Sequence, residues 1–272
     1  MIRRNDAGSV FACAALCLRL SDPAAKLAAT AQAAVDFSAG RTGLDANAPP
    51  PEPIAVPGRP SRPRLVSPRA LPPRGLGTSE GRLALLHAVA HIEFNAINLA
   101  WDAVYRFRGM PRDYYRDWIG VAADEARHFA MLQARLGELG GSYGDFDAHD
   151  GLWEMAVKTA DSCLARMALV PRVLEARGLD VTPGMIARLR DVGDAASAEI
   201  LEIILREEVA HVAAGSRWFV YCCEREGRDP DATFAVLIAE HARGALKGPF
   251  NRDARLAAGF SAAELARLEA AA

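Results

Sequence analysis

Four long stretches of helical sequence, separated by short breaks that contain glycine or proline, limit the fold of this chain more than any other feature. Apolar residues in these stretches recur at the spacing that places them on one face of an α-helix. Alanine is used heavily, and β-branched and aromatic residues sparingly, which also favours helix over strand. Helices are expected at about 79–106, 112–139, 152–175, 183–190, 194–226, 231–243 and 261–271. Four long helices with mostly short connections predict an all-α four-helix bundle at 79–227, followed by a C-terminal helical extension at 228–272.

The chain before the bundle divides into two regions. Residues 1–38 are predicted to be helical, with a break at Asp22 and Pro23 between two short helices. Residues 39–78 contain ten prolines, which exclude helix and favour extended chain. We interpret this proline-rich arm as a linker or as a strap packed on the bundle. Contact between its arginines and a phosphate-bearing partner is the alternative.

Charge and cysteine usage exclude several classes of protein. No apolar run approaches the roughly 20 residues that span a bilayer. Arg19 interrupts the apolar stretch Val10–Leu20, which otherwise resembles a signal peptide. The five cysteines lack CxxC pairs and are interpreted as reduced thiols, which predicts a cytoplasmic protein. The formal net charge of −2 disfavours nucleic acid as a partner, although the arginines between 59 and 74 leave a local basic surface open.

Two Glu-x-x-His motifs lie on alternate long helices, Glu125 with His128 and Glu208 with His211. A three-residue step on a helix places both side chains on one face, where they can bind one metal ion. One such motif arises easily by chance, but two on alternate helices are a much stronger signal. Apolar neighbours on the same faces predict that these groups point into the core, where an unpartnered carboxylate is costly.

The other two long helices supply one further carboxylate each. Glu93 precedes Glu125 by 32 positions and Glu175 precedes Glu208 by 33, as an internal duplication would give. Asp161 and Glu154 are rival carboxylates for the third helix, but neither reproduces this spacing. One Glu from each of two helices and a Glu-x-x-His from each of the others is the ligand set of ferritin-like di-iron carboxylate proteins. Buried acids satisfied by His and Arg in a metal-free bundle are the alternative.

Several other polar residues lie beside these ligands. His87 and His91 are interpreted as core histidines or as partners of the ligands rather than as ligands. Asp124 and Glu207, each adjacent to a ligand in the sequence, are expected to face outward or to support the site.

The stretches around these residues resemble a bacterial ferritin-like family, domain of unknown function 455. The similar segments are His87–Asn95, Asp124–His128, Pro171–Asp180, Glu207–Val212, the proline-rich arm and the tail Leu246–Asn251. The resemblance implies a ferritin-like fold and the six metal ligands, but no substrate. More distantly, Glu175-Ala-Arg177 is similar to bacterial tRNA hydroxylases, and demethoxyubiquinone hydroxylases share the four-Glu, two-His scheme.

Carboxylate and imidazole ligands suit two iron ions, with manganese or a mixed pair as alternatives. The expected function is an O₂-dependent di-iron oxygenase or oxidase acting on a small organic substrate. Iron handling by a ferroxidase or storage protein is the main alternative, and tRNA hydroxylation is the third. The substrate and electron donor are left open, and so is the oligomeric state, with a homodimer as one option.

The third long helix is expected to be irregular. Pro171 cannot donate to the carbonyl of Met167, which predicts a kink, and Gly178 and Pro183 are expected to interrupt the helix. We expect residues 178–183 to line a substrate entrance, with Arg172 or Arg177 available to hold an anionic group. A plain loop between two helices is the alternative.

Overall fold

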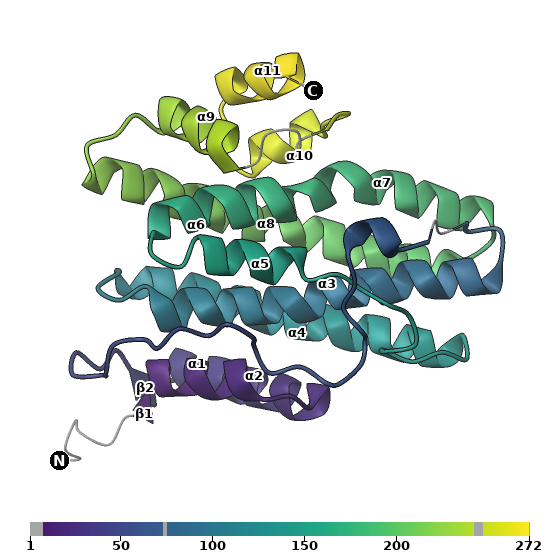
Figure 1. The fold of residues 1–272 in the computed structure, drawn as a ribbon, viewed down its shortest axis with the longest axis horizontal. Helices are drawn as coiled ribbons and strands as arrows, with labels where there is room; N and C mark the ends of the chain where they lie inside the picture. The colour runs from purple at the N-terminus through teal and green to yellow at the C-terminus, as the bar shows by residue number, and fades with distance from the viewer. Residues whose placement is uncertain (1–7, 73–74, 242–246, 272) are drawn as a thin grey trace. The chain divides into compact units, whose positions relative to one another are not determined.

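A computed structural model describes residues 8–72, 75–241 and 247–271 of the chain, and within them the fold is essentially all-α, as predicted (Figure 1). The described strands are β1 (Gly8–Ser9) and β2 (Thr42–Gly43), which pair in parallel. The chain divides into two compact units, Met1–Val157 and Lys158–Ala272. The division falls inside the range expected for the bundle, so each unit contains one pair of long helices.

The long helices of the first unit are α3 (Ser79–Arg106) and α4 (Arg112–Glu138). α3 begins where the Thr78 hydroxyl accepts a hydrogen bond from the Gly81 amide at 3.0 Å. The connection of residues 107–111 is so short that the two helices run antiparallel along one another. Both boundaries agree with the sequence prediction to within a residue or two.

Two N-terminal helices cover this pair. α1 (Val10–Arg19) packs on α3, and α2 (Pro23–Ser38) packs on α4 (Figure 1). The predicted break between them is confirmed, because the Asp22 carboxylate caps α2 by accepting from the Ala25 amide at 2.7 Å. The buried Lys26 ammonium of α2 donates to the Cys17 carbonyl at 2.8 Å and to Asn98 Oδ1 on α3.

The proline-rich arm is a strap on the first unit. Gly58 donates to the Leu18 carbonyl at 2.6 Å and lies so close to the end of α1 that a Cβ there would come within 2.4 Å of backbone atoms. The indole of Trp153, on α5 (Gly151–Lys158), donates to the Ala55 carbonyl at 3.0 Å. Leu65 forms a β-bridge with Ala148. Only the short 3₁₀ turn η1 (Pro68–Ala70) is helical in the described part of the arm.

α3 also passes a length-and-composition test for a membrane span. However, 72% of its most apolar window is buried inside the protein. His87, Glu93 and Asp102 lie buried along the same helix. The core helix of a globular protein passes this test equally well, and we describe α3 as a core helix.

The chain from α5 to α7, which crosses from the first unit into the second, differs from the sequence prediction. A single helix was expected to run from about residue 152 through Glu175. The structure instead has α5, then α6 (Cys163–Leu169), a π-helix η2 (Val170–Glu175) and α7 (Ala176–Asp191). The irregularity expected near Pro171 takes the form of this π-helix. The expected break at residues 178–183 is wrong, because α7 runs through Gly178 and Pro183 without interruption.

A side chain from far along the sequence explains why Pro183 is tolerated. Proline has no amide hydrogen for the carbonyl four residues earlier, which is that of Leu179. The Asn251 side-chain amide donates to this carbonyl at 3.1 Å. The hydrogen bond that proline removes is thus replaced, and the helix continues.

The remaining helices of the second unit are α8 (Ala195–Arg225), α9 (Pro230–His241), α10 (Arg252–Ala257) and α11 (Ala262–Ala271). α8, α9 and α11 agree with the prediction, although the expected end of α9 at residue 243 lies outside the described residues. α10 was not predicted. The three C-terminal helices gather beside α6, α7 and α8 (Figure 1).

Candidate metal centre

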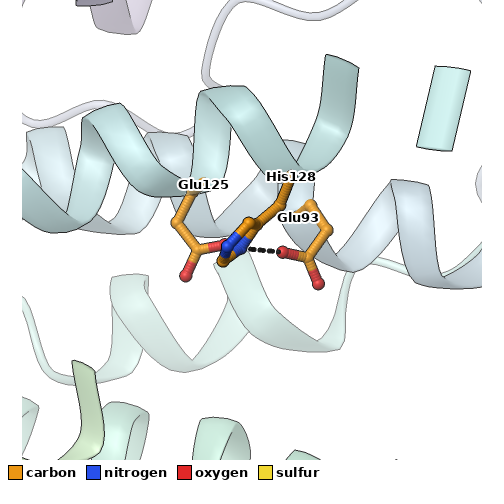
Figure 2. Close-up of side chains that lie close together, drawn as sticks. All are labelled: Glu93, Glu125 and His128. Carbon is orange, nitrogen blue, oxygen red and sulfur yellow. Dashed lines mark hydrogen bonds and ion pairs between the residues drawn. The ribbon is translucent and has the colours of Figure 1, made fainter. Parts of the chain in front are cut away.

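Glu93, Glu125 and His128 form a compact cluster between α3 and α4 in the first unit (Figure 2). His128 Nδ1 lies 3.1 Å from Glu93 Oε2 and 3.4 Å from Glu125 Oε2. One potential ligand atom from each residue lies within 4.8 Å of the other two. All three side chains are buried, with residue exposures of 5%, 1% and 0%. This arrangement can offer two oxygens and one nitrogen to a metal ion.

Local sequence explains this convergence. Glu125 and His128 are one helical turn apart on α4, so both point to the same side. The short connection between α3 and α4 brings Glu93 level with them, because helices rise by the same distance per residue in either direction. The rings of Phe94 and Phe129, each adjacent to a cluster residue, lie 5.3 Å apart between their centroids. Both rings are buried in the core.

Burial and mutual charge govern the protonation of this cluster. Burial, and then the charge of Glu125, raise the pKa of Glu93 well above its usual range. Burial lowers the pKa of His128, but hydrogen bonds and charges from Glu125 and Glu93 outweigh this effect and raise it to about 10. Two buried carboxylates so close together favour a bound cation, either a proton on histidine or a metal ion.

The second unit carries the other Glu-x-x-His motif on α8. His211 Nδ1 lies 3.1 Å from Glu208 Oε2, and both groups are largely buried. α7 approaches α8 closely here, since a Cβ on Gly178 would lie 4.0 Å from Glu208 Cγ. Glu175 is the last residue of η2 and is also buried. Within the described part of this unit, Glu175 does not complete a group of three close donors with Glu208 and His211.

The two other histidines of α3 stabilise a loop. His87 Nε2 accepts from the Gly144 amide at 2.9 Å. His91 Nδ1 lies 2.9 Å from the Tyr143 hydroxyl, and its Nε2 lies 3.1 Å from the His149 carbonyl. Burial lowers the pKa of His91 to about 4, so its ring is neutral. Both rings join α3 to the loop that follows α4.

Asp124 and Glu207 each lie near an arginine of the same helix. Asp124 is partly exposed and pairs with Arg127 at 3.2 Å. The carboxylate of Glu207 lies 3.8 Å from Arg206. Both carboxylates are partly exposed, and their expected role, outward-facing or supporting the site, stays a prediction.

Arg172 does not have the role that the sequence suggested. It was expected to be available for an anionic group at a substrate entrance, but its Nη2 donates to both carboxylate oxygens of Glu264 at 2.8 Å. Arg177 donates to the Lys247 carbonyl and lies 3.7 Å from the Asp180 carboxylate. Sequence reasoning missed Glu264, although Ser261-x-x-Glu264 is a recognisable helix-capping signal.

Comparison with known proteins agrees with the resemblance seen in the sequence. The family described as "Protein of unknown function (DUF455)" matches residues 19–266. An uncharacterized protein of Haemophilus influenzae is 46% identical over 213 residues, which cover 76% of this chain and 74% of the relative. No solved structure matches significantly.

Proposed function

We propose, for a chain that belongs to the protein family of unknown function DUF455, that its two ligand clusters together hold a pair of iron or manganese ions. The observation that carries this proposal is the buried cluster of Glu93, Glu125 and His128. A buried trio of two carboxylates and an imidazole is costly without a cation, and this donor set suits iron or manganese. The duplicated spacing of the second motif supports a matching half-site.

In this proposal the six residues divide the two ions between them. Glu125 and Glu208 would be shared by the two ions, His128 and His211 would each hold one ion, and Glu93 and Glu175 would complete the ligand set. Ferritin-like di-iron proteins take their ligands from four helices in this way. The shared Glu-x-x-His pattern supports this pairing.

We propose that the protein is an O₂-dependent oxidoreductase of the oxygenase or oxidase type, acting in the cytoplasm on a small organic substrate. A pair of reduced metal ions would supply the oxidising chemistry by reacting with O₂. The chain's own contribution begins with protons. His128 must release its proton from Nδ1 before that nitrogen can bind a metal ion, so loading the site releases protons. The burial of Glu93, Glu125 and His128 keeps bulk water away from the cluster.

Iron handling remains the alternative function. A storage subunit consists of little more than its bundle, whereas this chain adds N-terminal helices, a strap and C-terminal helices. These additions favour a defined substrate. The third function, tRNA hydroxylation, needs a basic surface, and at least one arginine of the arm, Arg64, is paired with Asp147.

Metal analysis of protein purified from its native host tests the proposal. We expect two irons or manganeses per chain and, for iron under air, an oxo-bridge absorption band. A chain that binds no transition metal would refute the proposal. Size-exclusion chromatography after iron loading separates the alternatives, because a large iron-filled shell would establish storage.

A further inference from the structure

Arg172 is a buried arginine that the proposed chemistry does not use. It lies in η2, three residues before Glu175, and its side chain is 2% exposed. Its Nη2 binds both oxygens of Glu264, whose side chain is 4% exposed. A buried ion pair with this geometry strongly resists removal of either partner, because the remaining charge would be left without compensation.

Three aromatic rings surround the Arg172 guanidinium. Its Cζ lies 4.1 Å from the ring centroid of Phe234, 4.5 Å from that of Phe260 and 4.7 Å from that of Phe219. Each ring is within the range of a cation–π interaction. Phe234 is on α9 and Phe260 precedes α11, so the C-terminal helices supply most of the enclosure. Arg172 therefore holds η2 against α9 and the start of α11.

Glu264 has a second role that ties this contact to α11. Its carboxylate accepts from the Ser261 amide at 2.8 Å, and its own amide donates to the Ser261 hydroxyl at 3.0 Å. This reciprocal pair is a capping box at the start of α11. The Ser261 hydroxyl also donates to Asp231 at the start of α9. The Glu264 carboxylate thus joins the start of α11 to η2, and the Ser261 hydroxyl joins the start of α11 to that of α9.

A second buried anchor lies on the other side of Glu175. Arg255 of α10 donates to both oxygens of Asp180 on α7, at 2.9 and 2.7 Å, and both side chains are fully buried. The Phe260 ring lies 4.9 Å from the Arg255 guanidinium as well as 4.5 Å from that of Arg172. The backbone that carries Glu175 is therefore held three residues before it and five residues after it by the same C-terminal segment.

We propose that Arg172 is a positioning residue for Glu175, and that the C-terminal helices α9–α11, through Glu264, set how tightly the second half of the metal site binds its ion. A π-helix is a strained turn that often occurs at functional sites, so an external restraint on η2 has a direct effect on the side chain at its end. This inference rests on the proposed di-metal site. It adds a dependence of metal affinity on residues that do not touch the metal.

Glu264→Gln is the test variant, measured in the full chain with Mn²⁺ as the probe. Glutamine retains the capping box, so the change removes the charge facing Arg172 and leaves the start of α11 capped. The control is Glu269→Gln, which removes an exposed ion pair between α10 and α11, with Arg252 at 3.1 Å. Circular dichroism and the melting temperature show that each variant is folded at the temperature of measurement.

We expect the wild type and Glu269→Gln to bind two Mn²⁺ per chain. For Glu264→Gln, one of the two binding steps should weaken by about 10- to 100-fold, as when residues that orient metal ligands are removed. The other step should be unchanged. A general loss of structure would instead weaken both steps, so this split separates positioning from simple destabilisation.

Two Mn²⁺ bound by Glu264→Gln with wild-type affinities would overturn the inference and leave the proposed function intact. A wild type that binds no metal would overturn both. Should Glu264→Gln fail to fold, Phe260→Leu is measured instead, because it keeps an apolar side chain but removes the ring between Arg172 and Arg255. Weakening of one binding step in that variant supports the inference, and unchanged binding overturns it.

Discussion

The two Glu-x-x-His motifs have nearly the same local sequence spacing but different structural support. In the first unit, Glu93, Glu125 and His128 lie on two regular α-helices, α3 and α4. In the second unit, Glu175 ends a π-helix. Hydrogen bonds among Glu93, Glu125 and His128 hold the first cluster together. The position of Glu175 depends, in our proposal, on the contacts between η2 and the C-terminal helices.

The buried cations near these helix pairs differ as well. Lys26 of the first unit donates to two neutral oxygens, those of Cys17 and Asn98. Arg172 and Arg255 of the second unit are each paired with a carboxylate. A duplicated ligand pattern therefore does not require a duplicated scaffold. Each half can be stabilised by whichever terminal segment packs against it.

The largest expected effect tests whether both halves bind metal. His128→Ala and His211→Ala should each reduce the bound metal from two ions to about one per chain, with the affinity for the lost ion falling by more than about 100-fold, since even indirect supports contribute 10- to 100-fold. Equilibrium dialysis with elemental analysis measures this. Helical content should not change. Two ions bound with normal affinity in either variant would exclude that histidine as a ligand.

The next effect concerns Lys26, whose buried ammonium donates to two neutral oxygens. Burial lowers the pKa of Lys26 from 10.5 to about 8. Between pH 8 and 10.5 the unfolded chain holds a proton that the folded chain has released, so this residue makes stability rise with pH, by about 3 kcal/mol in all. Below pH 8 both states are protonated and its contribution is constant.

Lys26→Met isolates this effect, because the cysteine thiols of the unfolded chain also titrate in this range. The difference in unfolding free energy between Lys26→Met and wild type should favour the variant most at pH 7.5 and shrink as the pH approaches 10.5. Urea denaturation at a series of pH values measures this. A constant difference would show that Lys26 keeps its ordinary pKa when buried.

A smaller effect is expected at the close contact between Gly215 of α8 and Pro171 of η2. A Cβ on Gly215 of α8 would lie 2.3 Å from Pro171 Cγ, so Gly215→Ala must displace the π-helix. We expect a loss of about 1–3 kcal/mol in unfolding free energy, as for overpacked cores. Gly184→Ala on α7 is the control, because its Cβ would meet nothing within 4 Å. Equal effects in the two variants would mean that Gly215 has no special role.

The smallest effect tests the regularity of the first pair. Gly120 lies in α4 with nothing within 4 Å of an added Cβ. Gly120→Ala should raise the unfolding free energy by about 0.5–1 kcal/mol, because alanine loses less conformational freedom in a helix. Thermal unfolding is sensitive enough to detect this gain. A loss of stability would mean that the added methyl group clashes with a neighbouring atom, contrary to the open space around Gly120.

The sequence predicted α3 and α4 well because the residues that begin and end these helices lie at their own ends. Thr78 caps α3, and Gly109 and Gly140 adopt positive φ angles of 72° and 81° where the helices end. The Glu-x-x-His spacing likewise predicted which side chains share a face, and Glu93 was placed correctly beside Glu125 and His128.

The third long helix was predicted less well because its structure depends on distant residues. Pro183 is tolerated through Asn251, and Arg172 is neutralised by Glu264, 92 positions away. No local pattern could reveal either partner. The metal pair itself stays a prediction that the second motif supports by its spacing alone.

The replacement of a backbone hydrogen bond by the Asn251 side chain has a consequence for synthesis of the chain. Leu179 and Asn251 are 72 positions apart. During translation, α7 leaves the ribosome well before the residue that satisfies its free carbonyl at Leu179. Met1–Val157 form a compact unit, and N-terminal compact units generally fold first while the rest of a chain is being made. In the second unit, α7 lacks this hydrogen bond until Asn251 has been made, so chains that stop before Asn251 should contain a less stable α7.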